Sequence, residues 1–351
     1  MNLGILLSPG ESLNLMKKTG QDVRFVKLYL EAYAKNFTKV YVFSYEDENP
    51  NLPKNVRLIP NQTRLHRLIY ALMLPIINKK VINDCDVIRG FGLASSLSSL
   101  FLSKPFVFNW AYDYVSFVKL QNKIFYVPSY IILEMIAFLK AKKVFIATKS
   151  KFKKLNGNKF IYLPNGVDLE LFKPKALKKE GLIFIGRLEK QKNLYFLISA
   201  ISLLPSKVRS VTFIGLGSLK DSLMRWASKK KVKLTIANPI PHNQLPKMLG
   251  KFSVFLLSSL HEGSPKVLLE TMATGLVPVV TNFPTAKEVI NNGQEGFITN
   301  FDQKDFASKV QLLLSDEKLY KKMSSSAVSR IKREFDQDLL IRKEISILKN
   351  V

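Results

Sequence analysis

The stretch Val254–Val280, VFLLSSLHEGSPKVLLETMATGLVPVV, contains a complete strand–loop–helix–strand unit. The runs Val254–Ser258 and Val277–Val280 have the length and the branched apolar composition of strands that are buried on both faces. Between them, Pro265–Thr274 is predicted to be a helix, since proline suits the first helical position. A chain built from such units folds into α/β layers around a parallel sheet.

The same alternation of short apolar strands and amphipathic helices continues outward over the whole chain. It occurs in two blocks of similar length, which predicts the α/β class with two facing Rossmann-like domains, each with a parallel sheet. The expected strands are Leu3–Leu7, Val40–Ser44, Val56–Ile59, Asp86–Gly90, Phe106–Asn109, Lys143–Thr148, Leu182–Ile185, Val211–Ile214, Lys233–Ile236, Val254–Ser258, Val277–Val280 and Gly296–Ile298. The expected helices are Val23–Asn36, Leu93–Leu102, Leu194–Leu204, Lys220–Lys230, Leu245–Leu249, Pro265–Thr274, Asp305–Ser315 and Lys318–Arg333.

The boundary between the two blocks falls in Tyr162–Gly181, YLPNGVDLELFKPKALKKEG. Its prolines, glycines and lysine cluster are signals of turns and linkers. We therefore expect one domain over residues 1–172, a second over residues 173–335, and a final helix over residues 336–351 that returns to the first domain.

The composition of the 351 residues is that of a globular chain, with 47% hydrophobic and 23% charged residues. It excludes a disordered chain, a collagen-like chain and a disulfide scaffold, and Cys85 is the single cysteine. No apolar run reaches the roughly 20 residues that span a bilayer. The first residues lack the basic segment of a signal peptide, so we expect a cytoplasmic protein.

The charge balance is strongly positive, with 54 Lys and Arg against 27 Asp and Glu and a net charge of +27. Such a field favours polyanions, which include nucleic acid, anionic lipid and phosphorylated substrates. The excess is spread evenly over both halves, so a solvated, lysine-rich surface explains it equally well.

The first loop that follows a predicted strand in the second half is GRLEKQKN. Gly186 permits close approach of a backbone, Arg187 offers a planar fork for phosphate oxygens, and Lys192 precedes a helix N-terminus that favours anions. These features indicate a pyrophosphate site. The alternative is two solvated cations on a loop.

The second loop, FIGLGSLKDSL, contains Gly215 and Gly217 directly after a strand. A dinucleotide fingerprint requires a third glycine, and that position is Lys220. This absence argues against a nicotinamide cofactor and favours a tight turn that lines a cleft.

The third loop carries two carboxylates, Glu262 and Glu270, eight positions apart. Glu262 lies at the tip of the loop, and backbone groups of residues 263–267 at the helix N-terminus can hold a phosphate or a sugar hydroxyl. An acidic residue that simply complements the helix dipole would explain Glu262. It would not explain Glu270, which lies in the apolar segment VLLETMA and requires a polar partner.

Taken together, GRLEKQKN, the PNGVD of Pro164–Asp168 and HEGSPKVLLETMATGLVPVV resemble the motifs of retaining glycosyltransferases with the GT-B fold, of the family 4 or group 1 type. The family's E-x7-E pattern corresponds to Glu262 and Glu270. The resemblance implies an enzyme in which the C-terminal domain binds a nucleoside diphosphate sugar and the N-terminal domain binds the acceptor.

The resemblance also implies residue roles. Arg187 and Lys192 correspond to the cations that neutralise the diphosphate, Glu262 to the residue that contacts the donor sugar, and Glu270 to the one that holds the ribose. Glu262, Arg187 and Lys192 are thus the expected catalytic residues. The remaining residues expected to bind the donor are Gly10, Gly186, Gly215, Ile240, Gly263, Ser264, Pro265, Lys266 and Val267.

In the N-terminal half the resemblance is more general. Gly10 corresponds to a loop glycine near the donor phosphates, although the next position, often glycine in the family, is Glu11. Tyr112 and Asp113, in FNWAYDYVSF, are the expected acceptor-side residues, and a packed aromatic ring is the alternative for Tyr112.

A metal ion is not expected, because Arg187 and Lys192 supply the positive charge, and no cofactor besides the donor is implied. The Asp-Cys-Asp of residues 84–86 is interpreted as a turn that enters a strand. The three histidines, His66, His242 and His261, lack the spacing of metal ligands.

Two segments, Arg64–Lys80 and Lys119–Lys143, combine apolar residues with cations at both ends. Segments of this kind can lie in a membrane interface, which would suit a lipid-linked acceptor and peripheral attachment to the cytoplasmic face. The alternative is that both are ordinary helices packed on the N-terminal sheet.

The sequence thus predicts a retaining glycosyltransferase that acts on a glycan or lipid-linked acceptor in the synthesis of surface polysaccharide, glycolipid or glycoprotein glycan. A nucleotide-sugar epimerase with the GT-B fold is one alternative. A nucleic-acid-binding protein is suggested by charge alone, and no recognised module supports it, so nucleic acid is not an expected partner.

Overall fold

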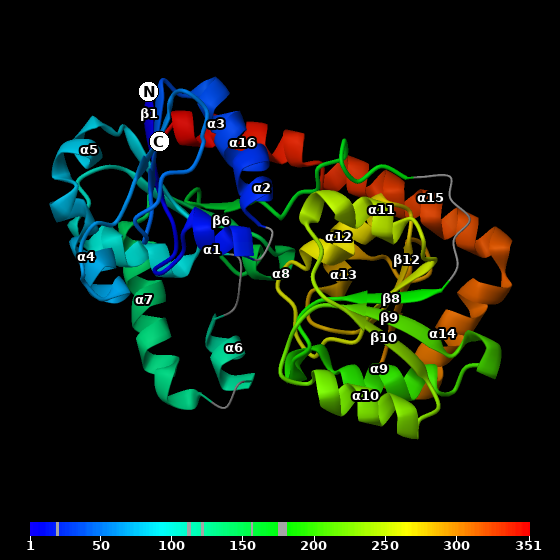
Figure 1. Ribbon diagram of the computed structural model, residues 1–351. Helices are drawn as coiled ribbons and strands as arrows, with labels where there is room; N and C mark the ends of the chain where they lie inside the picture. Colours follow the sequence, from blue (N-terminus) through cyan, green and yellow to red (C-terminus); the bar gives the residue numbers. More distant parts are fainter. Residues whose placement is uncertain (19–20, 111–113, 121–122, 156, 175–180) are drawn as a thin grey trace. The chain divides into compact units, whose positions relative to one another are not determined.

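The computed structural model describes residues 1–18, 21–110, 114–120, 123–155, 157–174 and 181–351. The chain divides into two compact units, each built on its own sheet (Figure 1). The first unit contains Met1–Pro164 and Asp338–Val351, and the second contains Asn165–Gln337. The division therefore precedes residue 172, because Val167 and Phe172 are buried in the core of the second unit.

The first unit contains a seven-stranded sheet in the order β3-β2-β1-β4-β5-β6-β7, and every strand pair is parallel. Its strands are β1 (Asn2–Leu6), β2 (Lys39–Phe43), β3 (Val56–Ile59), β4 (Val87–Gly90), β5 (Phe106–Trp110), β6 (Lys143–Ile146) and β7 (Phe160–Tyr162). Its helices are α1 (Leu13–Lys18), α2 (Asp22–Phe25), η1 (Val26–Leu30), α3 (Glu31–Asn36), α4 (Arg67–Ile77), α5 (Lys79–Asp84), η2 (Leu93–Phe101), α6 (Tyr114–Leu120), η3 (Ile124–Tyr126), α7 (Val127–Lys140), α8 (Lys149–Phe152) and α16 (Gln337–Lys349).

The second unit contains a six-stranded sheet in the order β10-β9-β8-β11-β12-β13, again with parallel pairs throughout. Its strands are β8 (Leu182–Ile185), β9 (Ser210–Ile214), β10 (Lys233–Ala237), β11 (Val254–Leu257), β12 (Val277–Thr281) and β13 (Phe297–Thr299). Its helices are η4 (Lys190–Lys192), α9 (Leu194–Ile201), η5 (Ser206–Val208), α10 (Lys220–Lys229), η6 (His242–Gln244), α11 (Leu245–Leu249), α12 (Lys266–Ala273), α13 (Ala286–Val289), α14 (Gln303–Ser315) and α15 (Glu317–Glu334).

Both sheets have the strand order of a doubly wound Rossmann fold. The chain adds strands from the first strand to one edge of the sheet, then returns to the other side of the first strand and adds the remaining strands toward the opposite edge. All twelve predicted strands are present, within a residue or two of their expected ends, and β7 is an additional edge strand. The strands β11 and β12 are buried along their whole length, as the continuous apolar runs predicted. The predicted α/β class with two parallel sheets is confirmed.

Two predicted helices have a different local form. The segment Leu93–Phe101 is a 3-10 helix. Three of its four serine hydroxyls, those of Ser95, Ser96 and Ser99, donate to carbonyls three residues earlier, as Ser96 Oγ does to Leu93 O at 2.6 Å. Such bonds favour the tighter turn. Within the predicted helix Val23–Asn36, residues Val26–Leu30 form a π-helix.

The helix α16 is anchored in the first unit by a buried ion pair. Glu344 Oε1 accepts from Arg89 Nε at 2.5 Å and from Tyr33 OH at 2.7 Å. The Arg89 guanidinium also lies 4.5 Å from the centroid of the Phe91 ring, and its side chain is only 3% exposed. This network joins α16, α3 and β4, which explains why the end of the chain belongs to the first unit.

The acidic pair around Cys85 lies at the N-terminal edge of the first sheet. Asp86 Oδ2 accepts from Asn2 N at 2.7 Å, and Asp84 Oδ2 is 3.2 Å from Lys39 Nζ. These carboxylates therefore join strand ends. Within the described parts of the chain, no group of three or more His, Cys, Asp and Glu side chains is placed to hold a metal ion.

Candidate functional site

The candidate site lies at the carboxyl ends of β8 and β11, which are neighbours in the second sheet. This is the switch point of the strand order, where the loops leave for opposite faces of the sheet and leave room for a ligand. The loop after β8 contains Gly186, Arg187 and Lys192, and the loop after β11 contains Glu262. The fold thus brings together two motifs that are about 70 residues apart in sequence.

Lys192 and Glu262 are in direct contact. The Lys192 ammonium donates to Glu262 Oε1, and the same oxygen accepts from Ser259 Oγ at 2.6 Å. The exposed fractions of the two side chains are 13% and 10%. Two residues for which the resemblance implied separate roles, one at the diphosphate and one at the sugar, therefore form one largely buried, hydrogen-bonded pair.

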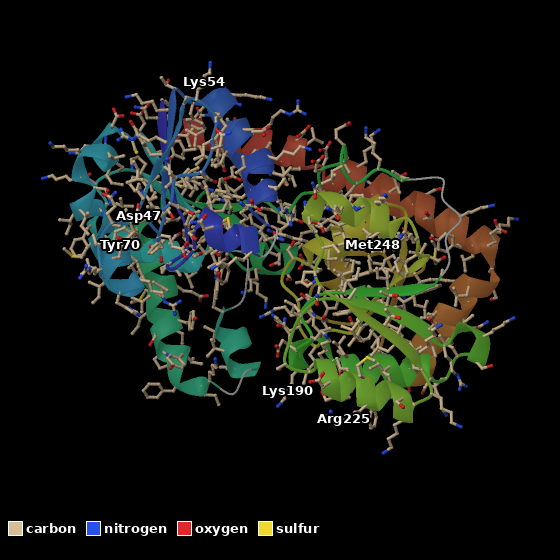
Figure 2. The ribbon with its side chains drawn as sticks, viewed as in Figure 1. Asp47, Lys54, Tyr70, Lys190, Arg225 and Met248 are labelled. Atoms are coloured by element: carbon tan, nitrogen blue, oxygen red, sulfur yellow. The ribbon has the colours of Figure 1, made fainter. Side chains whose placement is uncertain are left out.

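Gln191 joins the two loops at a second point. Its Nε2 donates to His261 O at 2.7 Å, and its backbone O accepts from Leu260 N at 2.9 Å. Arg187 Nη2 lies 3.4 Å from Gln191 Oε1 and leaves most of its guanidinium exposed. Arg187 and Lys190 are both exposed and therefore present positive charge at the rim of the site. Figure 2 labels Lys190.

Side chains from outside the loop fix the segment around Glu262. Thr285 Oγ1 donates to Glu262 O at 3.0 Å, and Asn165 Nδ2 donates to Ser264 O at 2.9 Å. Asn165 comes from the PNGVD motif, which gives that motif a structural function at the site. The helix α12 then begins at Lys266, directly after Pro265, with the positive end of its dipole at the loop.

Glu270 lies within α12 and is paired with a histidine. Its Oε1 is 3.0 Å from His242 Nε2, and both side chains are buried. The Phe172 ring packs against His242 at 5.1 Å between centroids. The polar partner that the sequence required for Glu270 is thus His242 of η6. The position of His242 in the sequence had excluded only a role as a metal ligand.

The glycines of the loops after β8 and β9 are required by close backbone packing. A Cβ at Gly215 would lie 2.0 Å from Gly186 O, and one at Gly217 would lie 2.3 Å from Leu188 O. Neither position can accept a side chain without separating the two loops. The need for glycine here comes from the protein's own backbone.

The remaining predicted residues have varied environments. In the second unit, Gly263 is buried, Lys266 is exposed, and Val267 and Ile240 are partly buried against the core. Gly10 belongs to the first unit, where φ of +88° makes glycine favourable in its turn. Tyr112 and Asp113 lie outside the described residues.

Sequence reasoning overlooked the residues that position the motifs. These are Gln191, Ser259, His242, Thr285 and Asn165. Asn165 and Gln191 stand inside motifs that had already been singled out, so their location was a usable signal. No sequence signal indicated His242 or Thr285, because only the tertiary fold brings them near the carboxylates.

Residues 169–330 match the protein family described as "Glycosyl transferases group 1". The match includes the loops after β8 and β11 and both carboxylates. The resemblance drawn from the motifs is confirmed for this part of the chain.

Two curated bacterial relatives are similar over about half of the chain. One is the Escherichia coli "UDP-Gal:alpha-D-GlcNAc-diphosphoundecaprenol alpha-1,3-galactosyltransferase", 30% identical over 198 residues, which are 51% of this chain and 51% of the relative. The other is the Campylobacter jejuni "N-acetylgalactosamine-N,N'-diacetylbacillosaminyl-diphospho-undecaprenol 4-alpha-N-acetylgalactosaminyltransferase", 28% identical over 193 residues, which are 53% of this chain and 52% of the relative. The aligned region thus spans about half the length of these relatives. Both are transferases, and nothing in the comparisons supports an epimerase.

Among solved structures, a sucrose-phosphate synthase from Thermosynechococcus elongatus superposes with a TM-score of 0.80. The superposition covers 100% of this chain and 98% of that protein, with 15% sequence identity. At this identity the likeness shows the fold, which is the GT-B fold expected from the motifs.

Proposed function

We propose that this chain, which carries a group 1 glycosyl transferase region over residues 169–330, transfers a sugar from a nucleoside diphosphate sugar with retention at the anomeric carbon. The observation that carries the proposal is the Lys192–Glu262 pair at the switch point of the second sheet. A partly buried cation, a carboxylate and a helix N-terminus in one loop cluster match the charge pattern of a phosphorylated sugar.

The diphosphate of the donor is bound by cations and by the helix dipole. Lys192 and Arg187 supply positive charge, and the N-terminus of α12 adds the field of its aligned peptide dipoles. The leaving diphosphate gains negative charge as the glycosidic bond breaks, so fixed positive groups stabilise the transition state. We accordingly propose that transfer requires no metal ion.

The two carboxylates bind different parts of the donor. Glu262, held by Ser259 and by the Lys192 ammonium, accepts from a sugar hydroxyl. Glu270, held by His242, accepts from the hydroxyls of the nucleotide ribose. A carboxylate fixed by a neighbour loses little freedom when it binds, which increases the affinity gained per hydrogen bond.

The acceptor is proposed to be a glycan on a lipid carrier at the cytoplasmic face of a membrane. The names of both relatives describe acceptors linked to a diphosphoundecaprenol carrier, and this supports the proposal. The product would be a lipid-linked intermediate of a surface polysaccharide, glycolipid or glycoprotein glycan.

Thermal unfolding with a panel of UDP, GDP, ADP and TDP sugars in EDTA tests donor binding, because a ligand that binds the native state raises the melting temperature. The donor identified in this way is then incubated with polyprenyl-diphosphate-linked acceptors. Transfer in EDTA supports the proposal. Loss of the sugar nucleotide without any acceptor would instead support the epimerase alternative.

A further inference from the structure

The first unit has an apolar face that its other described elements leave exposed. The helices α4 and α7 both pack against η2, and we call the outer surfaces of these elements, together with η3, the α4–α7 face (Figure 1). Half of the exposed large hydrophobic side chains among the described residues lie here. Water-soluble helices normally direct a polar face to solvent, so such a concentration indicates a binding surface.

The helix α4 has apolar side chains on both of its faces. Its inner face buries Tyr70, labelled in Figure 2, and Leu74. Its outer face exposes Leu68, Ile69, Ile76 and Ile77, and Leu65 precedes them in the same register. Packing on the first sheet therefore uses only one side of this helix.

The helix α7 and the turn before it show the same pattern more strongly. Ile131, Ile132 and Met135 are exposed at helical spacing, and Leu139 is 75% exposed. In the preceding turn, the Phe125 side chain is 91% exposed. An aromatic ring held in water at the end of a helix has an unfavourable hydration free energy that burial against a partner would relieve.

The charges in the two stretches of chain that form α4 and α7 and their ends are almost entirely positive. The stretch 64–80 contains four Lys and Arg and no acidic residue. The stretch 123–143 contains four lysines and one carboxylate, Glu134, which accepts from Trp110 Nε1 at 2.9 Å and is half-buried. An apolar face with a cationic border matches an anionic bilayer surface, whose acyl region and phosphates lie a few ångströms apart in depth.

We propose that the α4–α7 face docks on an anionic phospholipid bilayer. The Phe125 ring and the Leu139 side chain enter the acyl boundary, and lysines such as Lys79 and Lys80 reach the phosphates. The inference rests on the proposed function in one respect, since a lipid-linked acceptor would lie at that bilayer. Beyond the proposed function, the inference identifies the surface of the protein that contacts the bilayer and the negative lipid charge that this contact requires.

Vesicle flotation with the full chain tests the surface. Vesicles of phosphatidylcholine alone are compared with vesicles that contain about 30% phosphatidylglycerol, at low salt and at about 0.5 M salt. We expect binding to the anionic vesicles only, and weaker binding at high salt. Equal binding to both vesicle types, or none to anionic vesicles at low salt, would overturn the proposal.

Two paired variants separate the apolar and the charged contributions. Phe125→Ser with Leu139→Ser, and Lys79→Glu with Lys80→Glu, should each weaken vesicle binding by about tenfold or more. The matched controls lie in the second unit: Leu203→Ser with Leu312→Ser, and Lys318→Glu with Lys322→Glu. These control residues are exposed in the same way, so their variants should bind vesicles as the parent chain does. If the test and control variants lose vesicle binding equally, binding depends on the overall charge and hydrophobicity of the chain and not on the α4–α7 face.

Two further measurements identify other outcomes. Donor-induced thermal shifts, recorded without vesicles, report on the donor site and not on the bilayer contact, so a chain that binds donor but not vesicles disproves the surface and leaves the proposed function standing. Light scattering reports on self-association. A dimer abolished by Phe125→Ser with Leu139→Ser, without vesicle binding by the parent chain, would assign the face to a second copy of the chain instead.

Discussion

His242 Nε2 lies 3.0 Å from Glu270 Oε1, and this contact joins a short 3-10 turn to the middle of α12 inside the second unit. Both side chains are buried, so the carboxylate is held in one position before any ligand arrives. A carboxylate on an otherwise apolar helix would cost several kcal/mol of folding free energy without such a partner. The contact with His242 offsets this cost, and the fixed Glu270 carboxylate is suited to accept hydrogen bonds from hydroxyl groups.

Glu270→Gln should weaken donor binding by about tenfold or more, because a hydrogen bond to a charged group contributes about 1.5–3 kcal/mol. The effect should appear in the Kd of the nucleotide sugar, measured by calorimetry, and in KM more than in kcat. The matched control is Glu317→Gln, which changes an exposed carboxylate of α15 in the same unit. If both variants bind donor as the parent does, Glu270 has no role in the donor site.

His242→Ala should raise KM for the donor by about tenfold with little change in kcat, because Glu270 loses the group that orients it. His242→Gln keeps a hydrogen-bond donor and should recover part of the affinity. A purely structural role for His242 predicts a lower melting temperature in both variants and no recovery of KM. Steady-state kinetics and thermal unfolding of the same samples separate the two outcomes.

Lys192→Ala should lower kcat by about 100-fold or more, which is the usual effect of removing one group that stabilises developing charge. It should also lower the melting temperature, since Glu262 is left buried without its ammonium partner. The pair Lys192→Met with Glu262→Gln should recover the melting temperature but not the activity. Recovery of both would contradict the catalytic assignment.

Glu344→Gln should destabilise the first unit by about 3–5 kcal/mol, because the Arg89 guanidinium would remain buried without its counter-charge. Replacing the whole network with apolar residues, Arg89→Met with Glu344→Leu and Tyr33→Phe, should restore most of the loss, because no buried polar group is then left without a partner. Urea unfolding measures both variants. Donor binding, which is proposed for the loops of the second unit, serves as the control and should be unchanged.

Tyr33 should make the stability of the first unit fall at alkaline pH. Burial, reinforced by the Glu344 carboxylate, holds the pKa of Tyr33 well above its usual value. Because the folded-state pKa exceeds that of the unfolded chain, the stabilisation is complete below about pH 10 and is lost as the pH rises toward the folded-state value. The melting temperature should therefore decline above about pH 10. A Tyr33→Phe variant should decline less steeply, and an identical slope would exclude this origin.

Most of the fold could be predicted from the sequence, because strand and helix periods are local properties. The run Val277–Val280 is apolar at every position, which is typical of a strand buried on both faces of a parallel sheet. It can therefore be predicted as a strand without tertiary information. The π-helix at Val26–Leu30 was not predictable in this way, since its apolar pattern is also that of an α-helix. The edge strand β7, at Phe160–Tyr162, is only three residues long and gives a weak signal.

The candidate site was predictable in its charged residues and its loop glycines. The loops that follow two predicted strands contain Arg187, Lys192 and Glu262. Because the carboxyl ends of parallel strands lie at the same edge of a sheet, these residues are expected at that edge. Their contacts were not predictable. That Lys192 pairs with Glu262 depends on β8 and β11 being neighbours, which is a property of strand order.

By itself, the sequence determined the α/β alternation, the two blocks, the positive charge and the loop motifs, because these depend on residues close together in the chain. Only the tertiary structure decided which distant side chains meet, as His242 and Glu270 do, and which apolar surfaces remain uncovered, as on α4 and α7. The physical reason is that local pattern sets the shape of each element. Contact and burial depend on which other element comes to lie against it.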